Sequence, residues 1–208
     1  MKLYYSPGAC SLSPHIVLLE SGLPFEARMV SLKTHKLADD TDYYGINPKG
    51  YVPLLEFDNG ERLTEGPAIV QWVADQVPAK HLAPPAGTMA RYHLIEWLNF
   101  ITAELHKSFS VLFNPAMPEE AKALVRTKLA ERFGYVDQQL AGKPYLTGEH
   151  FTVADAYLFV IARWAQPMKV ELANLDRLGE FIARVAARPA VQQALQAEGL
   201  THGEAKRL

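Results

Sequence analysis

Residues 2–20 have the sequence KLYYSPGACSLSPHIVLLE, and this stretch decides the fold. Residues 2–5 predict a short strand, which Pro7 and Gly8 end. The apolar positions of the second half recur at helical spacing and predict a helix. Cys10, the only cysteine of the chain, therefore lies at the first turn of that helix. Unpaired backbone N–H groups and the helix dipole favour a thiolate there, so we expect a pKa below about 8.5. The alternative is a small, buried apolar side chain.

The whole sequence has the composition of a globular protein with one large domain or two small ones. It has 208 residues, a formal net charge of -2 and no basic stripe, which argues against a nucleic-acid partner. One cysteine cannot form an internal disulfide. We see neither a signal-peptide pattern nor an apolar run of the roughly 18 residues that cross a bilayer, so we expect a cytoplasmic protein without a membrane partner. The histidines lack the spacing of metal ligands, so we expect no metal site.

The first predicted domain, residues 1–77, alternates short apolar runs with helical stretches. After the first helix we predict a strand over residues 25–30, a loop over 32–50, a hairpin over 52–63 and a helix from Pro67. The hairpin is indicated by its Asn59-Gly60 pair, which is typical of a tight turn between strands. This order predicts a small mixed sheet with helices on its faces.

Residues 78–87 form a connector rich in proline and glycine, and residues 88–208 are predicted as an all-helical second domain. Apolar residues at helical spacing predict helices over residues 90–112, 118–140, 174–188 and 189–198. Thr152 and Asp155 have the spacing of a capping box at the start of another helix. The polar residues 201–208 are expected to fray.

Residues 10–13 have the outline of a Cys-x-x-Cys redox turn in which serine replaces the second cysteine. A dithiol resolves a mixed disulfide internally, whereas a lone thiol needs an external thiol. Any mixed disulfide formed at Cys10 would therefore wait for a partner, and glutathione is the abundant cytosolic candidate.

The segment Gly50-Tyr51-Val52-Pro53 opens the predicted hairpin. If the bond before Pro53 is cis, the Val52 backbone turns outward as an unpaired strand edge to which an extended peptide can add. The alternative is an ordinary trans proline at a strand start, which is the commoner form.

The segment Thr64-Glu65-Gly66-Pro67 lies at a strand-to-helix junction. Backbone N–H groups at a helix start can hold a carboxylate, and Glu65 can pair with an ammonium group. Together they suit the amino-acid end of a γ-glutamyl group. The alternative is a helix start stabilised by its own acidic residue.

His106 is a candidate acid–base residue in the second domain. It follows Asn99 by seven residues, about two turns, with Ala103 between them, so we expect all three on one face of the predicted long helix. A neutral His106 can accept or orient a thiol proton, and a protonated one can stabilise a thiolate. The alternative is a helix-surface histidine without a role.

The order and spacing of these motifs resemble the glutathione S-transferases, most closely the bacterial beta class, over essentially residues 1–200. The resemblance is carried by SPGACSL at 6–12, NPKGYVP at 47–53, LTEG at 63–66, EWLNF at 96–100, ELHK at 104–107 and FTVADAY at 151–157. It implies an α/β thioredoxin-like N-terminal domain and an all-α C-terminal helical domain that lines the electrophile site and the dimer interface. It also implies a homodimer, a cis bond before Pro53, and glutathione as co-substrate with no other cofactor.

By position, the resemblance makes the Val52 backbone the partner of the cysteinyl unit of glutathione, and Glu65 with Gly66 the γ-glutamyl site. It implies Cys10 and His106 as the catalytic residues. The implied glutathione-binding residues are Cys10, His35, Tyr51, Val52, Pro53, Glu65, Gly66, Asn99, Ala103, Glu104, His106 and Lys107.

Two of these positions depart from the family pattern. His35 stands where relatives often carry a lysine that holds the glycine carboxylate, and a histidine there would be a weaker, pH-dependent clamp. Ala103 stands where a small polar residue is frequent, so its side chain offers no hydrogen bond. Both departures bear on the affinity for glutathione.

We therefore expect an enzyme that lowers the pKa of the glutathione thiol and directs the thiolate at an apolar electrophile. A second expected activity is thiol–disulfide exchange that depends on Cys10. The alternatives are a glutathione-dependent reductive dehalogenase of aromatic compounds and a non-catalytic, transferase-like binding module.

Aromatic residues of the second domain have two expected uses. Candidates for the wall of the electrophile site, or equally for the core, are Phe109, Phe113, Tyr157 and Trp164. The predicted long helix has more apolar surface than one domain face needs, because it carries Trp97, Phe100 and Phe109. This excess favours an isologous contact with a second copy of the chain.

Overall fold

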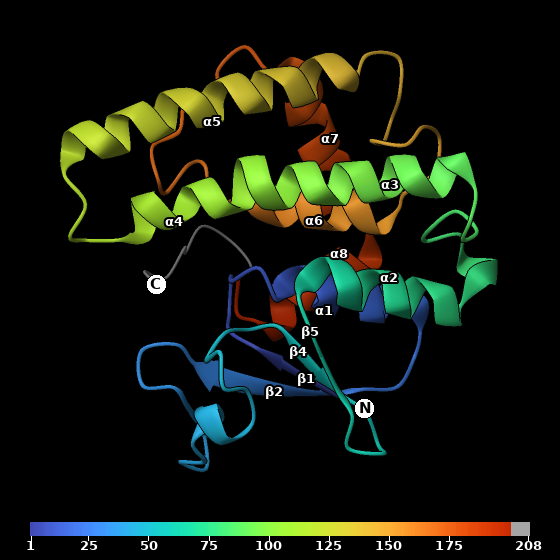
Figure 1. The fold of residues 1–208 in the computed structure, drawn as a ribbon. Coiled ribbons are helices and arrows are strands. Elements are labelled where there is room, and N and C mark those ends of the chain that lie inside the picture. The colour runs from blue at the N-terminus through green and yellow to red at the C-terminus, as the bar shows by residue number, and fades with distance from the viewer. Residues whose placement is uncertain (201–208) are drawn as a thin grey trace. The chain divides into compact units, whose positions relative to one another are not determined.

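The computed structural model describes residues 1–200, which divide into two compact units (Figure 1). The first unit contains residues 1–82 and the described residues from Arg188 onward, and the second contains residues 83–187. The first unit is a mixed sheet with helices, and the second is helical. The predicted fold class is therefore confirmed.

The first unit is built on a five-stranded sheet with the strand order β3-β2-β1-β4-β5. Its strands are β1 (Lys2–Tyr5), β2 (Glu26–Ser31), β3 (Lys36–Leu37), β4 (Leu54–Glu56) and β5 (Arg62–Thr64). β1 and β2 are parallel, and the other neighbouring pairs are antiparallel. Leu3 and Tyr4 are buried because β1 lies in the middle of the sheet. The predicted strands and the predicted hairpin of β4 and β5 are confirmed.

Three α-helices accompany this sheet: α1 (Leu12–Ser21), α2 (Gly66–Gln76) and α8 (Pro189–Ala197). Figure 1 shows them gathered on one side of the sheet. α1 contacts both α2 and α8, which explains why every residue from Leu12 to Leu18 is buried. A helix buried all round needs apolar residues on all its faces, as the sequence of α1 provides.

The polar segment 32–50, predicted as loop, contains two short elements. One is β3, which forms because Val30 and Leu37 pair in antiparallel register and are both buried. The other is a 3₁₀ turn over Tyr43–Gly45, where the Asp42 carboxylate accepts the Tyr44 N–H at 3.0 Å. A second 3₁₀ turn, Pro78–Lys80, lies in the predicted connector. Elements of two or three residues are too short to leave a period in the sequence.

The last helix belongs to the first unit, which differs from the predicted second domain of residues 88–208. Arg188 makes a two-pronged ion pair with Glu20 of α1, at 2.6 and 3.0 Å. The Glu198 carboxylate meets His15 Nδ1 at 2.8 Å and accepts the Gly8 N–H at 2.9 Å. These contacts fasten α8 to α1 and to the turn before Cys10. Residues 201–208, expected to fray, lie outside the described residues.

The second unit consists of α3 (Met89–Phe100), a π-helix (Ile101–His106), α4 (Lys107–Phe113), α5 (Glu119–Gln139), α6 (Val153–Ala162) and α7 (Asp176–Ala186). The first three run on without a break over the helix predicted at 90–112. Its middle part has i→i+5 hydrogen bonds in place of the expected α-helical ones. All ten residues of α6 are buried, so this helix forms the centre of the unit.

The predicted capping box of α6 is confirmed. One oxygen of the Asp155 carboxylate accepts the Thr152 N–H at 2.7 Å and the Thr152 hydroxyl at 2.8 Å, and the other accepts the Leu146 N–H at 2.8 Å. Burial raises the pKa of Asp155 to about 6, although these donors favour its charged form. Asp155 therefore ties the loop before α6 to the helix start.

Candidate functional site

Cys10 lies in the turn between β1 and α1, directly before Ser11, which stands at the N-terminal boundary of α1. The Ser11 hydroxyl accepts the Ser6 N–H at 3.1 Å and donates to the Ser6 carbonyl at 3.2 Å, which closes the turn. The Cys10 thiol donates to the Val52 carbonyl at 3.4 Å. The structure thus brings together the first two motifs singled out from the sequence.

The expected low pKa of Cys10 is wrong. Burial raises the pKa of the thiol to about 12, and the Glu65 carboxylate adds to the rise. The backbone N–H groups of Cys10 and Ser11 do favour the thiolate, as the helix-start argument requires, but they are outweighed. At neutral pH Cys10 is therefore a thiol and a hydrogen-bond donor.

The Val52–Pro53 peptide bond is cis, as the family resemblance implied. The preceding carbonyl, that of Tyr51, accepts the Tyr43 hydroxyl at 2.9 Å and the Asn47 amide at 2.7 Å. Among the described residues, the Val52 N–H has no hydrogen-bond partner. This corner therefore presents one unused backbone donor beside the thiol of Cys10.

Glu65 begins α2 in an uncommon conformation. Its φ is +68°, in the left-handed region that favours glycine, and its carboxylate does not cap the helix. The carboxylate instead pairs with Lys49 Nζ at 2.7 Å, and Lys49 also reaches the Thr64 hydroxyl at 3.0 Å. A strained residue with its acid turned away from its own helix is typical of a functional position. Sequence reasoning missed Lys49, although it lies inside the quoted 47–53 segment.

His35 lies in the turn between β2 and β3, with φ +53°. Its ring packs against Tyr44 at 4.6 Å between centroids, and its buried Nδ1 has no hydrogen-bond partner among the described residues. Within that part of the chain, no hydrogen bond, ion pair or ring contact joins His35 to Cys10, Val52 or Glu65. Its expected place in the site stays a prediction.

The candidate residues of the long helix point in three directions. Asn99, Ala103 and Lys107 are exposed. His106 faces α6, where its Nδ1 lies 2.5 Å from the Tyr157 hydroxyl. Glu104 faces α5, and Arg132 and Lys128 lie 2.9 and 3.5 Å from its carboxylate. These two cations lower the pKa of Glu104, the hydrogen bond from Arg132 most of all.

The π-helix changes the turn on which the prediction of one shared face rests. The expectation for Asn99, Ala103 and His106 assumed 3.6 residues per turn, and i→i+5 bonds give a wider turn. π-bulges are frequent at functional sites, and nothing in the apolar spacing indicated one here.

An aromatic cluster continues from His106. Trp164 packs edge-on against His106 at 5.1 Å, Phe109 at 5.5 Å and Phe113 at 5.2 Å. Phe109, Tyr157 and Trp164 are buried, and only Phe113 is exposed. Of the four candidates for an electrophile wall, Phe113 is thus the one that offers open apolar surface.

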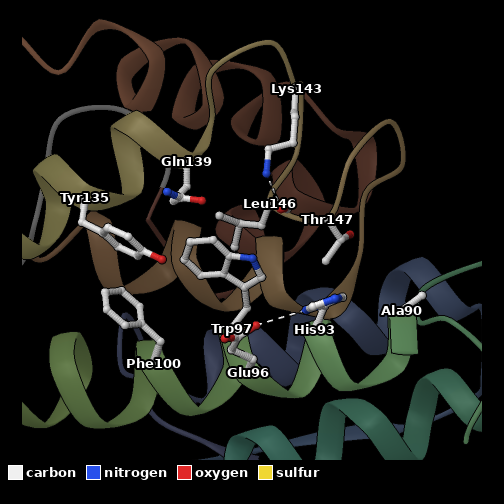
Figure 2. A pocket seen from close by; sticks show the side chains of 10 residues that line it. All are labelled: Ala90, His93, Glu96, Trp97, Phe100, Tyr135, Gln139, Lys143, Leu146 and Thr147. Carbon is white, nitrogen blue, oxygen red and sulfur yellow. Dashed lines mark hydrogen bonds and ion pairs between the residues drawn. The ribbon is translucent and has the colours of Figure 1, made fainter. Parts of the chain in front are cut away.

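The second unit also contains a cavity of about 420 Å³, lined by α3, α5 and residues 143–147 (Figure 2). Trp97, Phe100 and Tyr135 form its aromatic side, with ring centroids 5.3 to 6.1 Å apart. Figure 2 shows Gln139 beside Tyr135 on α5, and Lys143 and Thr147 across the cavity from Phe100. The excess aromatic surface expected on the long helix is therefore present, except that Phe109 is fully buried in its own unit.

Within residues 1–200, no helix combines the length and apolar character needed to cross a membrane. The same residues hold no group of three or more His, Cys, Asp or Glu side chains placed to bind a metal ion.

Two protein-family models match this chain. They are "Glutathione S-transferase, N-terminal domain" over residues 8–76 and "Glutathione S-transferase, C-terminal domain" over residues 103–198. Glutathione S-transferase GstA of Escherichia coli O157:H7 is 49% identical, over 96% of this chain and 100% of its own length. Glutathione S-transferase GST-4.5 of Xanthomonas campestris pv. campestris is 42% identical, with the same two coverages.

Solved structures give the same picture. BphK, a bacterial glutathione transferase solved as a ternary complex, is 57% identical with a TM-score of 0.94, over 96% of this chain and 100% of its own. A sphingomonad glutathione S-transferase in complex with glutathione is 45% identical with a TM-score of 0.93, over 97% and 100%. The similarity therefore extends over both units.

Proposed function

Because this chain belongs to the glutathione S-transferase family, we propose that it transfers glutathione to apolar electrophiles. The observation that carries the proposal is the corner at Val52 and Pro53, where an unused N–H lies next to the Cys10 thiol. An extended peptide adds to such an edge through its backbone. The cysteinyl unit of glutathione would pair with Val52, with its sulfur close to Cys10.

The other ends of the tripeptide have candidate partners in the same unit. Glu65 and the start of α2 at Gly66 suit the γ-glutamyl end, which carries one ammonium and one carboxylate. His35 is the candidate for the glycine carboxylate, and Tyr51 and Pro53 shape the corner between them. Asn99, Ala103, Glu104, His106 and Lys107 are the proposed contribution of the second unit.

Conjugation needs the glutathione thiol to lose its proton and its sulfur to attack carbon. The sulfur forms the new S–C bond, and the leaving group departs with the electron pair of the bond that breaks. His106 is the proposed group that receives or stabilises the thiol proton, with Tyr157 holding its ring at 2.5 Å. Cys10, as a thiol, would donate a hydrogen bond to the glutathione sulfur.

A second activity is favoured by one observation. Cys10 is a free thiol at the edge where the cysteinyl unit would lie, so thiol–disulfide exchange between Cys10 and a glutathione mixed disulfide is geometrically direct. Exchange requires the thiolate of Cys10, and the raised pKa makes that species scarce at neutral pH. Conjugation is therefore proposed as the principal activity.

We also propose a cytoplasmic homodimer in which a second copy of the chain covers the cavity of Figure 2. Aromatic side chains gathered at a concave face are typical of the buried core of an interface. Tyr135 is 44% exposed although it packs against Trp97 and Phe100. Sedimentation should give twice the 23.2 kDa of one chain, and Tyr135→Arg should shift the protein toward monomer. A monomer at micromolar concentration in the unmodified protein would contradict the dimer.

The test of the activity is a turnover screen with glutathione and three electrophile classes: aryl halides, epoxides and mixed disulfides. We expect thioether formation with at least one of the first two classes and calorimetric binding of glutathione. Binding without turnover in any class would favour the non-catalytic module. Release of halide with oxidation of glutathione to its disulfide would favour the reductive dehalogenase.

A further inference from the structure

Lys49 makes an ion pair with Glu65, and Lys49 has no role in the function proposed above. Its Nζ lies 2.7 Å from Glu65 Oε1 and 3.0 Å from the Thr64 hydroxyl. Both side chains of the pair are well exposed, at 49% for Lys49 and 69% for Glu65. An exposed pair of this kind contributes little to folding, because both ions are well solvated when they separate. A ligand can therefore exchange its partners at small cost.

The backbone that carries Lys49 is nevertheless fixed. The Lys49 N–H donates to Asn47 Oδ1 at 3.2 Å, and the Gly50 N–H donates to the Asn47 carbonyl at 2.8 Å. Gly50 has φ +68°, and a Cβ there would lie 2.6 Å from the ring of Tyr44. The turn thus fixes the backbone of Lys49, while its ammonium group stays accessible to solvent.

The start of α2 offers few donors to an anion. Pro67 has no N–H, and the N–H groups of Ala68 and Ile69 both donate to the Glu65 carbonyl at 3.0 Å. Of the first four residues of the helix, only Gly66 keeps an N–H without a partner among the described residues, and it has no side chain to add. A carboxylate bound here has two oxygens that accept hydrogen bonds, but the helix start offers only one N–H donor.

We propose that Lys49 binds the α-carboxylate of the γ-glutamyl end of glutathione, while Glu65 binds its α-ammonium. The inference rests on the proposed function, because it names a further residue of the proposed glutathione site. The pair of Lys49 and Glu65 carries one positive and one negative charge, as does the amino-acid end of the ligand. When the ligand binds, each protein ion exchanges its partner for the opposite ion of the ligand, so all four charges stay paired.

The experiment compares two ligands on four proteins, the unmodified chain and three variants, by calorimetry. The ligands are glutathione and γ-aminobutyryl-cysteinylglycine, which keeps the ammonium but lacks the α-carboxylate. Lys49→Met should weaken glutathione binding by about tenfold or more, the loss expected for one charge-assisted pair. The same variant should leave the affinity for the analogue unchanged, and Lys49→Arg should restore most of the glutathione affinity.

Lys2→Met is the matched control, because Lys2 is 45% exposed and pairs with Glu56 at 3.0 Å in the same unit. It should bind both ligands as the unmodified protein does. Unchanged or tighter glutathione binding by Lys49→Met would overturn the inference, since Lys49 would then only compete for Glu65. An equal loss for both ligands would also overturn it, because Lys49 would be structural. If the unmodified protein binds no glutathione, the proposed function itself fails.

Discussion

Two helix starts in this protein carry an acidic residue and use it in opposite ways. At α6, Asp155 is buried, and all three of its hydrogen-bond donors come from Thr152 and Leu146. At α2, Glu65 has positive φ, caps nothing and is 69% exposed. Both match the sequence signal of an acid at a helix N-terminus. An acidic side chain whose hydrogen bonds all come from the protein's own N–H and O–H groups has a structural role. An acidic side chain that accepts none of these bonds at its helix start is available to a ligand.

The largest expected effect lies on the structural side of this comparison. Asp155→Ala should destabilise the fold by about 3 kcal/mol, because the buried N–H groups of Leu146 and Thr152 lose their acceptor. Urea denaturation measures this loss, and Asp155→Asn, which keeps one acceptor oxygen, should cost less. A variant of unchanged stability would show that the capping box is dispensable and would remove one side of the comparison.

His106 tests whether one side chain can have both a structural and a functional role. It forms a hydrogen bond with Tyr157 and is also the proposed acid–base group. His106→Ala should lower the conjugation rate by about 10²-fold if it is the principal acid–base group, and should raise the pKa of bound glutathione. Thiolate absorbance against pH follows the second effect. The matched control is His150→Ala, an exposed histidine outside the proposed site and outside the cavity of Figure 2. Equal rates in the two variants would remove His106 from the mechanism.

Glu65 tests the ligand side directly. Glu65→Ala should weaken glutathione binding by about 1.5–3 kcal/mol, or roughly ten- to a hundredfold, because the ligand ammonium loses a charged partner. The stability of the fold should change by less than about 1 kcal/mol. Glu65→Gly should even stabilise the fold, since glycine adopts positive φ without strain. Glutathione affinity is measured by calorimetry, with Glu61→Ala as the control for the loss of any exposed acidic residue nearby. If Glu65→Ala binds glutathione with unchanged affinity, the ligand lies elsewhere.

Cys10 gives the smallest expected effect on conjugation and separates the two proposed activities. Cys10→Ser should abolish thiol–disulfide exchange, which needs a protein sulfur, and should lower conjugation only about fivefold, because a serine hydroxyl still donates a hydrogen bond. With a pKa of about 12, alkylation of Cys10 should keep accelerating above pH 9 rather than levelling off near the ordinary thiol pKa. If Cys10→Ser stops both reactions, the glutathione sulfur is not the only nucleophile of the conjugation.

Much of the fold could be predicted because its signals are local. Period-two alternation located β2, the Asn59-Gly60 pair located the hairpin of β4 and β5, and the spacing of Thr152 and Asp155 located the start of α6. The cis bond before Pro53 followed from the family resemblance alone, since the base rate favours trans.

The rest depended on contacts between distant residues, which a single sequence does not show. The ion pair of Arg188 with Glu20 joins α8 to the first unit across 168 positions of the chain. The direction of the Cys10 pKa depended on burial, which outweighs the backbone donors that the sequence did indicate. The partner of Lys49 was equally hidden, because Glu65 lies 16 residues further along the chain.

The position of α8 also sets an order of events during synthesis. The second unit is one continuous stretch, residues 83–187, so all of it emerges from the ribosome before α8 does. The first unit, although it is translated first, still lacks Arg188 and Glu198 at that moment. The acceptor for the Gly8 N–H and the partner of His15 are thus among the last described residues to emerge. Domains generally fold as units during translation, and the turn that carries Cys10 is therefore completed only when α8 has followed the whole of the second unit.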